Sequence, residues 1–82
     1  MIKIKYFAWI KDITKSEYEN LNYSNLKDIN ELKKILVKKY PKLKKFIDED
    51  IIRFSINQEY ITENKKINLN DEIAIFPPVS GG

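Results

Sequence analysis

The last six residues of the chain, Pro77 to Gly82, hold the group best suited to chemistry. Both glycines of the sequence, Gly81 and Gly82, stand at this end, after a strand-like run of apolar residues. Glycine has no side chain to bury and loses much conformational freedom when ordered, so a terminal pair favours a mobile segment. The prolines lack an amide proton for a sheet ladder and favour an extended exit. We therefore expect a folded body with a slender arm that ends in a free carboxylate.

Reactive side chains are scarce elsewhere, because the chain contains no cysteine and no histidine. Their absence excludes disulfides, thiolate nucleophiles, imidazole bases and nearly all zinc or iron sites. Five carboxylates could be read as acid–base pairs, but their surroundings predict loop and turn residues instead. These are Asp12, Glu17, Glu19, Asp71 and Glu72. The terminal carboxylate is then the only obvious reactive group, and we expect no bound cofactor and no metal.

The size and composition of the chain predict one globular domain. Its 82 residues, 43% of them hydrophobic, can bury a single modest core. No apolar run approaches the length of a membrane span, and the alternation over residues 2–6 begins too early for a signal peptide. We expect a cytoplasmic protein that does not associate with membranes.

A cluster of eight lysines between residues 27 and 45, opposed there only by Asp28 and Glu31, supplies most of the net charge of +3. Such a basic face can bind nucleic acid or an acidic partner. It can also be the solvated side of a helix. We favour the solvated face and expect no nucleic-acid partner, because nucleic-acid surfaces usually use several arginines and this chain has one.

Hydrophobic periodicity predicts five strands and one main helix. The strands are expected over residues 2–9, 17–23, 51–56, 59–61 and 73–76, with a turn at Asn57-Gln58. Residues 10–15 form a short connection with room for one helical turn, and Leu69 is expected to be buried in the connection over 62–72.

The main helix is predicted from its two ends and its apolar stripe. Asp28 and Glu31 have the spacing of a capping box, and the stripe then runs from Ile29 to Tyr40. Pro41 ends the helix, and a short additional helical turn is expected over residues 43–47.

One amphipathic helix must bury its apolar face against one face of the sheet. The first and last strands are the most apolar, so they are expected to be parallel neighbours at the centre of a mixed sheet. The predicted class is therefore α+β, with the ubiquitin-like β-grasp architecture. The β-grasp domain spans residues 1–76, and residues 77–82 are a flexible tail.

Three stretches resemble the small subunit of molybdopterin synthase, the MoaD family. They are the start over residues 1–8, the middle Ile56-Asn57-Gln58-Glu59, and the finish from Asp71 through Phe76-Pro77-Pro78-Val79-Ser80-Gly81-Gly82. The resemblance covers the whole chain, and the finish is its specific part.

The resemblance implies a sulfur carrier that is not an enzyme by itself. A MoeB-like, E1-like activating enzyme would use ATP and magnesium to adenylate the Gly82 carboxylate, and a sulfurtransferase system would convert it to a thiocarboxylate. The tail residues Pro77, Pro78, Val79, Ser80 and Gly81 would thread into a MoaE-like large subunit, in a heterotetramer. That subunit would hold the active site where sulfur reaches a pyranopterin precursor and forms the molybdopterin dithiolene.

The resemblance also implies a partner interface. Phe7, Tyr60 and Phe76 fall at apolar positions that pack against the large subunit in this family, and Lys11 falls at a frequently basic position. Phe7 and Phe76 can equally be core residues, since both are expected on central strands. Trp9 can pack against the helix or lie exposed at the end of a strand.

Two other functions fit a Gly-Gly carrier. One is a sulfur carrier for the thiazole of thiamine or another sulfur pathway. The other is a ubiquitin-like modifier whose terminus forms isopeptide bonds with lysines.

Overall fold

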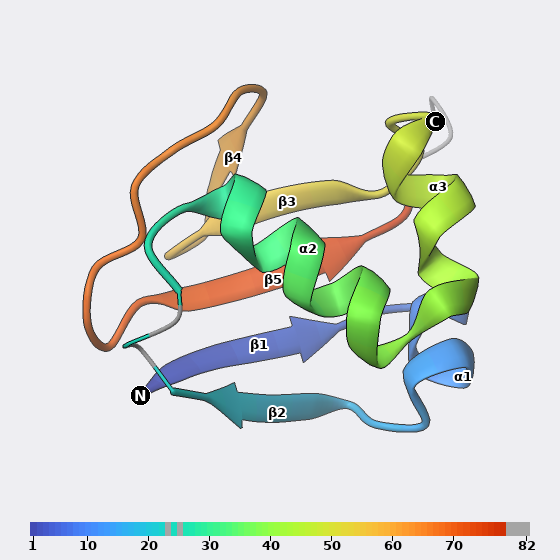
Figure 1. Cartoon of the computed structure of the whole chain (residues 1–82), viewed down its shortest axis with the longest axis horizontal. Coiled ribbons are helices and arrows are strands. Elements are labelled where there is room, and N and C mark those ends of the chain that lie inside the picture. Colours follow the sequence, from blue (N-terminus) through green and yellow to red (C-terminus); the bar gives the residue numbers. More distant parts are fainter. Residues whose placement is uncertain (23, 25, 79–82) are drawn as a thin grey trace.

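The structure is a computed structural model that describes residues 1–22, 24 and 26–78. Figure 1 shows a sheet with one helix, α2, lying across it. In chain order the elements are β1 (Ile2–Tyr6), α1 (Trp9–Thr14), β2 (Tyr18–Leu21), α2 (Ile29–Lys39), the 3-10 turn η2 (Pro41–Leu43), α3 (Lys44–Asp48), β3 (Arg53–Ile56), β4 (Glu59–Ile61) and β5 (Glu72–Phe76).

The five strands form one mixed sheet in the order β2-β1-β5-β3-β4. β1 and β5 are parallel neighbours at its centre, with Ile4 opposite Ile73 and Tyr6 opposite Ile75. The other three pairs of strands are antiparallel. The expected parallel pairing of the first and last strands is therefore confirmed.

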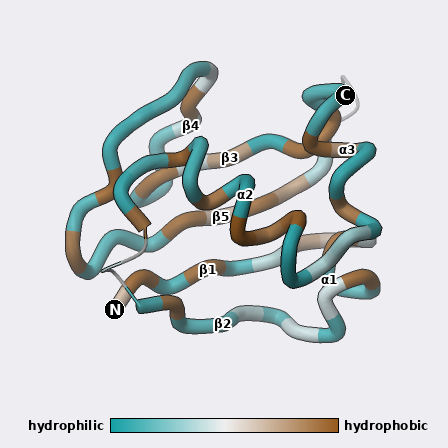
Figure 2. Tube along the Cα trace, in the orientation of Figure 1, coloured by the Kyte–Doolittle hydropathy of each residue, from teal (hydrophilic) through white to brown (hydrophobic). Residues whose placement is uncertain are grey.

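The core lies between the sheet and α2. Alternate residues of β1 and β5 are buried, and α2 buries Ile29, Leu32 and Leu36 against them. Figure 2 shows hydrophobic and hydrophilic segments alternating along α2, as a helix with one buried side requires. The buried hydrophobic residues are Ile2, Ile4, Tyr6, Ile10, Leu26, Ile29, Leu32, Leu36, Leu43, Ile47, Ile52, Phe54, Ile67, Ile73 and Ile75.

The predicted ends of α2 are confirmed. The Asp28 side chain accepts a hydrogen bond of 2.9 Å from the backbone N–H of Glu31, which caps the first turn. This backbone hydrogen bond, together with one from Asn64, lowers the pKa of Asp28. The helix ends at Lys39, with Tyr40 as its C-cap and Pro41 beginning η2.

Several strands are shorter than predicted. The strand expected over 2–9 ends at Tyr6, because the backbone at Ala8 turns to a positive φ of 55° and α1 begins at Trp9. The strand expected over 51–56 begins at Arg53, since the amides of Ile51 and Ile52 donate to the Phe46 carbonyl instead of the sheet. β2 is limited to Tyr18–Leu21, and Tyr23 lies outside the described residues.

The prediction that Leu69 is buried is wrong, because this side chain is 58% exposed. Ile67 occupies the core instead, where its backbone N–H donates to the Lys27 carbonyl at 2.9 Å. The connection then turns at Asn70, which has a φ of 70°. Asp71 is buried after the turn and accepts hydrogen bonds from the Asn57 side chain and the Asn68 amide.

Glu19 joins the edge strand β2 to the end of α2. Its Oε1 accepts hydrogen bonds from the hydroxyl groups of Tyr6, at 2.5 Å, and Tyr40, at 2.7 Å. Its Oε2 pairs with the Lys39 ammonium. The sequence interpretation of Glu19 as a loop or turn residue is therefore wrong.

The pKa shifts in this cluster follow from its burial and charge. Burial, followed by the hydrogen bond to Glu19, raises the pKa of Tyr6 far above its usual value. The same two causes raise the pKa of Tyr40 to about 12. Burial opposes the charged form of Glu19, but hydrogen bonds from Lys39, Tyr40 and Tyr6 outweigh it and lower the pKa of this carboxyl.

A first prediction concerns the Glu19→Gln variant. Because the pKa of Glu19 is lowered on folding, its carboxylate stabilises the fold above the ordinary value of 4.5, and this contribution disappears as the pH falls through the folded-state pKa. We expect the variant to lose about 1 kcal/mol of unfolding free energy at neutral pH. The difference from the wild type should shrink in acid, as measured by urea unfolding across the pH range.

Glu17→Gln is the matched control, since the Glu17 side chain is 82% exposed and makes only a long ion pair with Lys11. If the difference in unfolding free energy between the wild type and Glu19→Gln is the same at all pH values, the stabilising role assigned to the Glu19 carboxylate is contradicted.

Candidate functional site

The sheet face opposite the core is called the open face here. The strand register aligns one row of its residues across all five strands: Tyr18, Lys5, Ala74, Ser55 and Tyr60. These positions alternate with the core residues of the same strands, because successive side chains of a strand point to opposite faces.

Three predicted interface residues lie on the open face. Phe7 and Tyr60 are 46% and 51% exposed, and Phe76 is half-buried. The rings of Tyr60 and Phe76 contact each other with their centroids 6.2 Å apart. The alternative that Phe7 is a core residue is wrong, since its neighbour Tyr6 takes the core side of the strand. Exposed aromatic rings gathered on one face mark a surface suited to a protein partner.

Phe7 and Lys11 come together around a recess of about 250 Å³. Its lining residues are Lys5, Tyr6, Phe7, Lys11, Glu17 and Tyr18. The Lys11 ammonium lies 3.9 Å from the Glu17 carboxylate, and Lys5 lies 3.4 Å from Glu72. Both pairs are exposed and therefore contribute little to stability, so either ammonium can exchange its partner for another carboxylate.

Lys5 and Tyr18 were not among the predicted interface residues. The alternation of β1 places Lys5 on the open face, which the sequence pattern alone could have indicated. Tyr18 joins it only through the antiparallel pairing of β1 with β2, where the two residues are opposite each other. No local pattern contains that register.

The predicted tail begins at the end of the central strand β5. Pro77 is half-buried and Pro78 is exposed, and neither can extend the sheet ladder. Val79, Ser80, Gly81 and Gly82 lie outside the described residues. From Pro77 onward, six extended residues would reach about 20 Å beyond the body.

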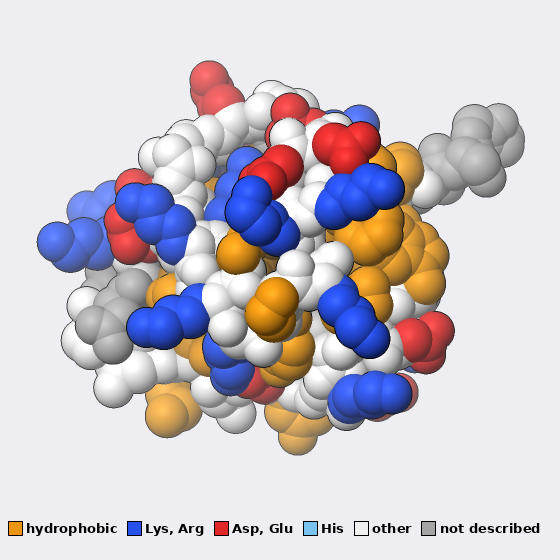
Figure 3. Space-filling view, turned by 45° about the vertical axis from the view of Figure 1, so that its right-hand side comes forward, with side chains coloured by type: hydrophobic (Ala, Val, Ile, Leu, Met, Phe, Trp, Pro, Cys, Tyr) orange, Lys and Arg blue, Asp and Glu red, His pale blue; other side chains and the backbone are white. Residues whose placement is uncertain are grey.

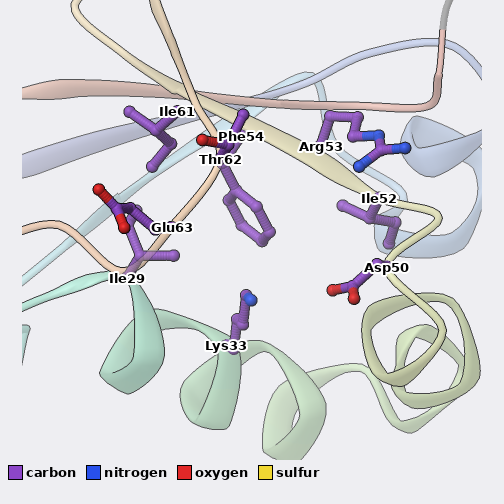
Figure 4. A pocket seen from close by; sticks show the side chains of 9 residues that line it. All are labelled: Ile29, Lys33, Asp50, Ile52, Arg53, Phe54, Ile61, Thr62 and Glu63. Carbon is purple, nitrogen blue, oxygen red and sulfur yellow. The ribbon is translucent and has the colours of Figure 1, made fainter.

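A second hollow, of about 170 Å³, lies between α2 and the β3–β4 hairpin. Figure 4 shows the Phe54 ring pointing toward Lys33 between these elements. The Lys33 ammonium lies 5.6 Å from the centroid of that ring, within the range of a cation–π contact. The charged side chains of Asp50, Arg53 and Glu63 also line the hollow.

Metal ligands do not gather in the part of the chain that the structure describes. Within residues 1–22, 24 and 26–78, no three or more Asp, Glu, His or Cys side chains are arranged to hold a metal ion. Likewise, none of the helices within these residues is long and apolar enough to cross a membrane.

Ala8 connects the open face to α1 through an unusual backbone conformation. Its φ of 55° and ψ of −138° suit glycine, because a Cβ atom crowds the backbone in this region. The turn separates Phe7, which lies on the open face, from Trp9, which begins α1. Trp9 is half-buried and stacks on Phe46, with the ring centroids 4.8 Å apart.

The architecture and the open face together define a class of proteins. The fold is the ubiquitin-like β-grasp. It superposes on SAMP1 from Haloferax volcanii with a TM-score of 0.79 and 26% identity, covering 99% of this chain and 98% of that one. It also superposes, with a TM-score of 0.70 and 26% identity, on one chain of a complex of subunits 1 and 2 of molybdopterin-converting factor from Helicobacter pylori, covering 99% of this chain and 97% of that chain.

The sequence matches the ThiS family over residues 4–82, and the chain belongs to this family. The molybdopterin synthase sulfur carrier subunit of Dictyostelium discoideum is 37% identical over 84 residues, covering 98% of this chain and 94% of the relative. The subunit of the same name from Caenorhabditis briggsae is 30% identical over 83 residues, covering 99% and 96%. The resemblance to this class of sulfur carriers is therefore confirmed.

A second prediction concerns the Ala8→Gly variant. Glycine adopts the conformation at position 8 without a Cβ clash, so we expect the unfolding free energy to rise by about 1 kcal/mol. Ala74→Gly in β5 is the control, where glycine should destabilise the sheet by about 1 kcal/mol. Urea unfolding measures both variants, and a destabilised Ala8→Gly variant would contradict the strain at this turn.

Proposed function

We propose that this chain is the sulfur-carrier subunit of a molybdopterin synthase, with the carboxylate of Gly82 as its reactive group. The observation that carries the proposal is the position of the tail. The central strand β5 ends at Phe76 beside an aromatic open face, and the chain continues into Pro77 and Pro78. Its relatives of nearly equal length carry the name of sulfur carrier subunits.

The proposed chemistry begins with activation of Gly82 by an E1-like enzyme. The carboxylate oxygen attacks the α-phosphorus of magnesium-bound ATP, and pyrophosphate leaves. A sulfur nucleophile supplied by a sulfurtransferase then attacks the acyl carbon, and AMP leaves with the bonding electron pair. The product is a thiocarboxylate, which places a soft nucleophile on a chain that has no cysteine. Glycine suits this end because the absence of a Cβ atom lets the backbone approach other groups closely.

The proposed acceptor is a pyranopterin precursor held by the large subunit. In each transfer the thiocarboxylate sulfur forms a bond to a carbon of the precursor and displaces an oxygen leaving group. Water then cleaves the acyl–sulfur bond and returns the tail as a carboxylate, so two transfers supply both sulfurs of the dithiolene. The open face is the proposed surface for that subunit, with Phe7, Tyr60 and Phe76 as apolar contacts and Lys11 facing a carboxylate. The assembly is proposed to be a heterotetramer.

A ubiquitin-like protein modifier is the second candidate. The observation that favours it is the similarity to small archaeal modifier proteins, including SAMP1 of Methanosarcina acetivorans at 28% identity and a TM-score of 0.78. The two functions share activation of Gly82 and differ in the acceptor, which is a lysine amine for a modifier. A carrier for thiazole synthesis would share the thiocarboxylate but act with a different partner.

The third prediction tests the terminus. Deleting Gly82 should leave the unfolding free energy unchanged, because the folded body keeps all its residues. The deletion should also abolish sulfur loading, because it removes the residue whose carboxylate is activated. The measurement is the intact mass after incubation with the activating enzyme, ATP and the sulfur donor, where one terminal oxygen is replaced by sulfur in the wild type.

Lys66→Ala is a control outside the proposed interface, and it should load as the wild type does. Full molybdopterin synthesis by a chain with a blocked terminus would rule out the mechanism. A ladder of lysine conjugates would favour the modifier, and co-purification with a thiazole synthase would favour the other carrier pathway.

The fourth prediction tests the open face with the double variant Phe7→Gln and Tyr60→Gln. Both side chains are exposed, so the unfolding free energy should change by less than about 1 kcal/mol. Binding to the large subunit should weaken by at least about 10-fold, because aromatic anchors dominate interfaces. Calorimetric titration measures the affinity.

Leu69→Gln is the matched control, since Leu69 is also an exposed apolar residue but lies outside the open face. If the double variant and the control bind the large subunit with equal affinity, the interface lies elsewhere on the molecule.

A further inference from the structure

A second apolar surface lies at the end of the body where the tail begins. Trp9 of α1 and Phe46 of α3 form a tilted aromatic pair, with the ring centroids 4.8 Å apart and the planes at 58°. Both residues pack against the outside of the core and remain half-buried. We call this pair the collar.

Two sets of hydrogen bonds place the collar at the carboxyl end of β5. The amide of Phe7, two residues before Trp9, donates to the Ile75 carbonyl at 3.0 Å. The Phe46 carbonyl accepts from Ile51 at 2.8 Å, two residues before Arg53, which is opposite Phe76 in the sheet. Figure 1 shows α1 and α3 at this end, and Figure 3 shows hydrophobic side chains gathering on the same side of the molecule.

Both helices of the collar are shorter than a helix that is stable alone. α1 has six residues and α3 has five, so their side-chain contacts with the body must hold them in place. Burying the two aromatic rings more completely would gain further hydrophobic free energy. Their exposed edges, at the root of the tail, are therefore available to a partner.

We propose that the collar docks against the apolar rim of the channel that receives the tail in the large subunit of the synthase. This inference rests on the proposed function, because it requires the tail to enter a channel. Six extended residues reach about 20 Å, so an enzyme that encloses Gly82 within its body must approach Phe76 closely. The residues around the tail root then meet the rim of that channel, which excludes water best with apolar side chains.

The collar is distinct from the open face in position and in residues. The contacts proposed for the open face are Phe7, Lys11, Tyr60 and Phe76, whereas the collar consists of Trp9 on α1 and Phe46 on α3. A partner that occupies only the open face would leave Trp9 in its present environment. One that also surrounds the tail root would bury Trp9, and this difference is measurable.

The chain contains a single tryptophan, which makes the collar directly observable. We would incorporate fluorotryptophan into this chain alone and record its fluorine NMR signal with and without the large subunit. The difference in chemical shift between H₂O and D₂O reports the exposure of the ring. On formation of the complex, most of this solvent isotope effect should disappear.

A pair of variants gives an independent test. Phe46→Gln should weaken binding to the large subunit by about 10-fold, as expected for loss of an aromatic anchor. Ile35→Gln is the matched control, because Ile35 is another half-buried apolar residue on the core but lies on α2. The control should bind within about 2-fold of the wild type, and circular dichroism establishes that each variant is folded.

The outcomes separate the two proposals. If the complex with the large subunit forms and sulfur is transferred while the isotope effect at Trp9 stays unchanged, the collar proposal is overturned and the proposed function stands. If Phe46→Gln does not fold, the fluorine signal of the wild-type chain decides alone. If the large subunit does not bind the wild-type chain, or Gly82 is never loaded with sulfur, the proposed function fails and the collar proposal with it.

Discussion

The parallel pairing of β1 with β5 is the contact on which the rest of the structure depends. It joins the two ends of the chain at the centre of the sheet, with Ile4 opposite Ile73 under α2. Because side chains alternate along a strand, burial of these isoleucines forces Lys5 and Ala74 onto the open face. The same pairing ends with Phe7 beside Ile75, so the aromatic side chains and the root of the tail meet at one end of the body.

Two further sets of contacts make this presentation rigid. Glu19 connects the edge strand β2 to Tyr6 and Tyr40, which fixes that edge against the end of α2. On the other side, the Asn57 side chain donates to the Asp71 carboxylate and accepts from the backbone N–H of Glu72 where β5 begins, so the central strand is held at its start. The body therefore offers a fixed platform at the end of β5, from which Pro77 and Pro78 continue the chain, and this suits the proposed sulfur-carrier function.

Local pattern and non-local contact contributed differently to what could be predicted. The α2 cap at Asp28, the stop at Pro41 and the turn at Asn57-Gln58 depend on neighbouring residues, and all three were predictable. Leu69 and Ile67 lie two residues apart in one polar connection, and only the contact of Ile67 with Lys27 decides which of them is buried. Similarly, β1 stops at Tyr6 because of a turn at Ala8 that no preference of alanine predicts.

The sequence by itself determined the class of fold and the types of side chain that are available for chemistry. Its periodicities specify one helix and a sheet, and its lack of cysteine and histidine is the reason that the C-terminal carboxylate is the proposed reactive group. Only the tertiary structure decided that Tyr6 is buried in the core while Phe7 is exposed. It also decided that Trp9 stacks on Phe46, and that the Glu19 carboxylate accepts hydrogen bonds from two tyrosines. The reason is physical, since strand register and side-chain burial are set by contacts between residues far apart in the chain, which a local pattern does not contain.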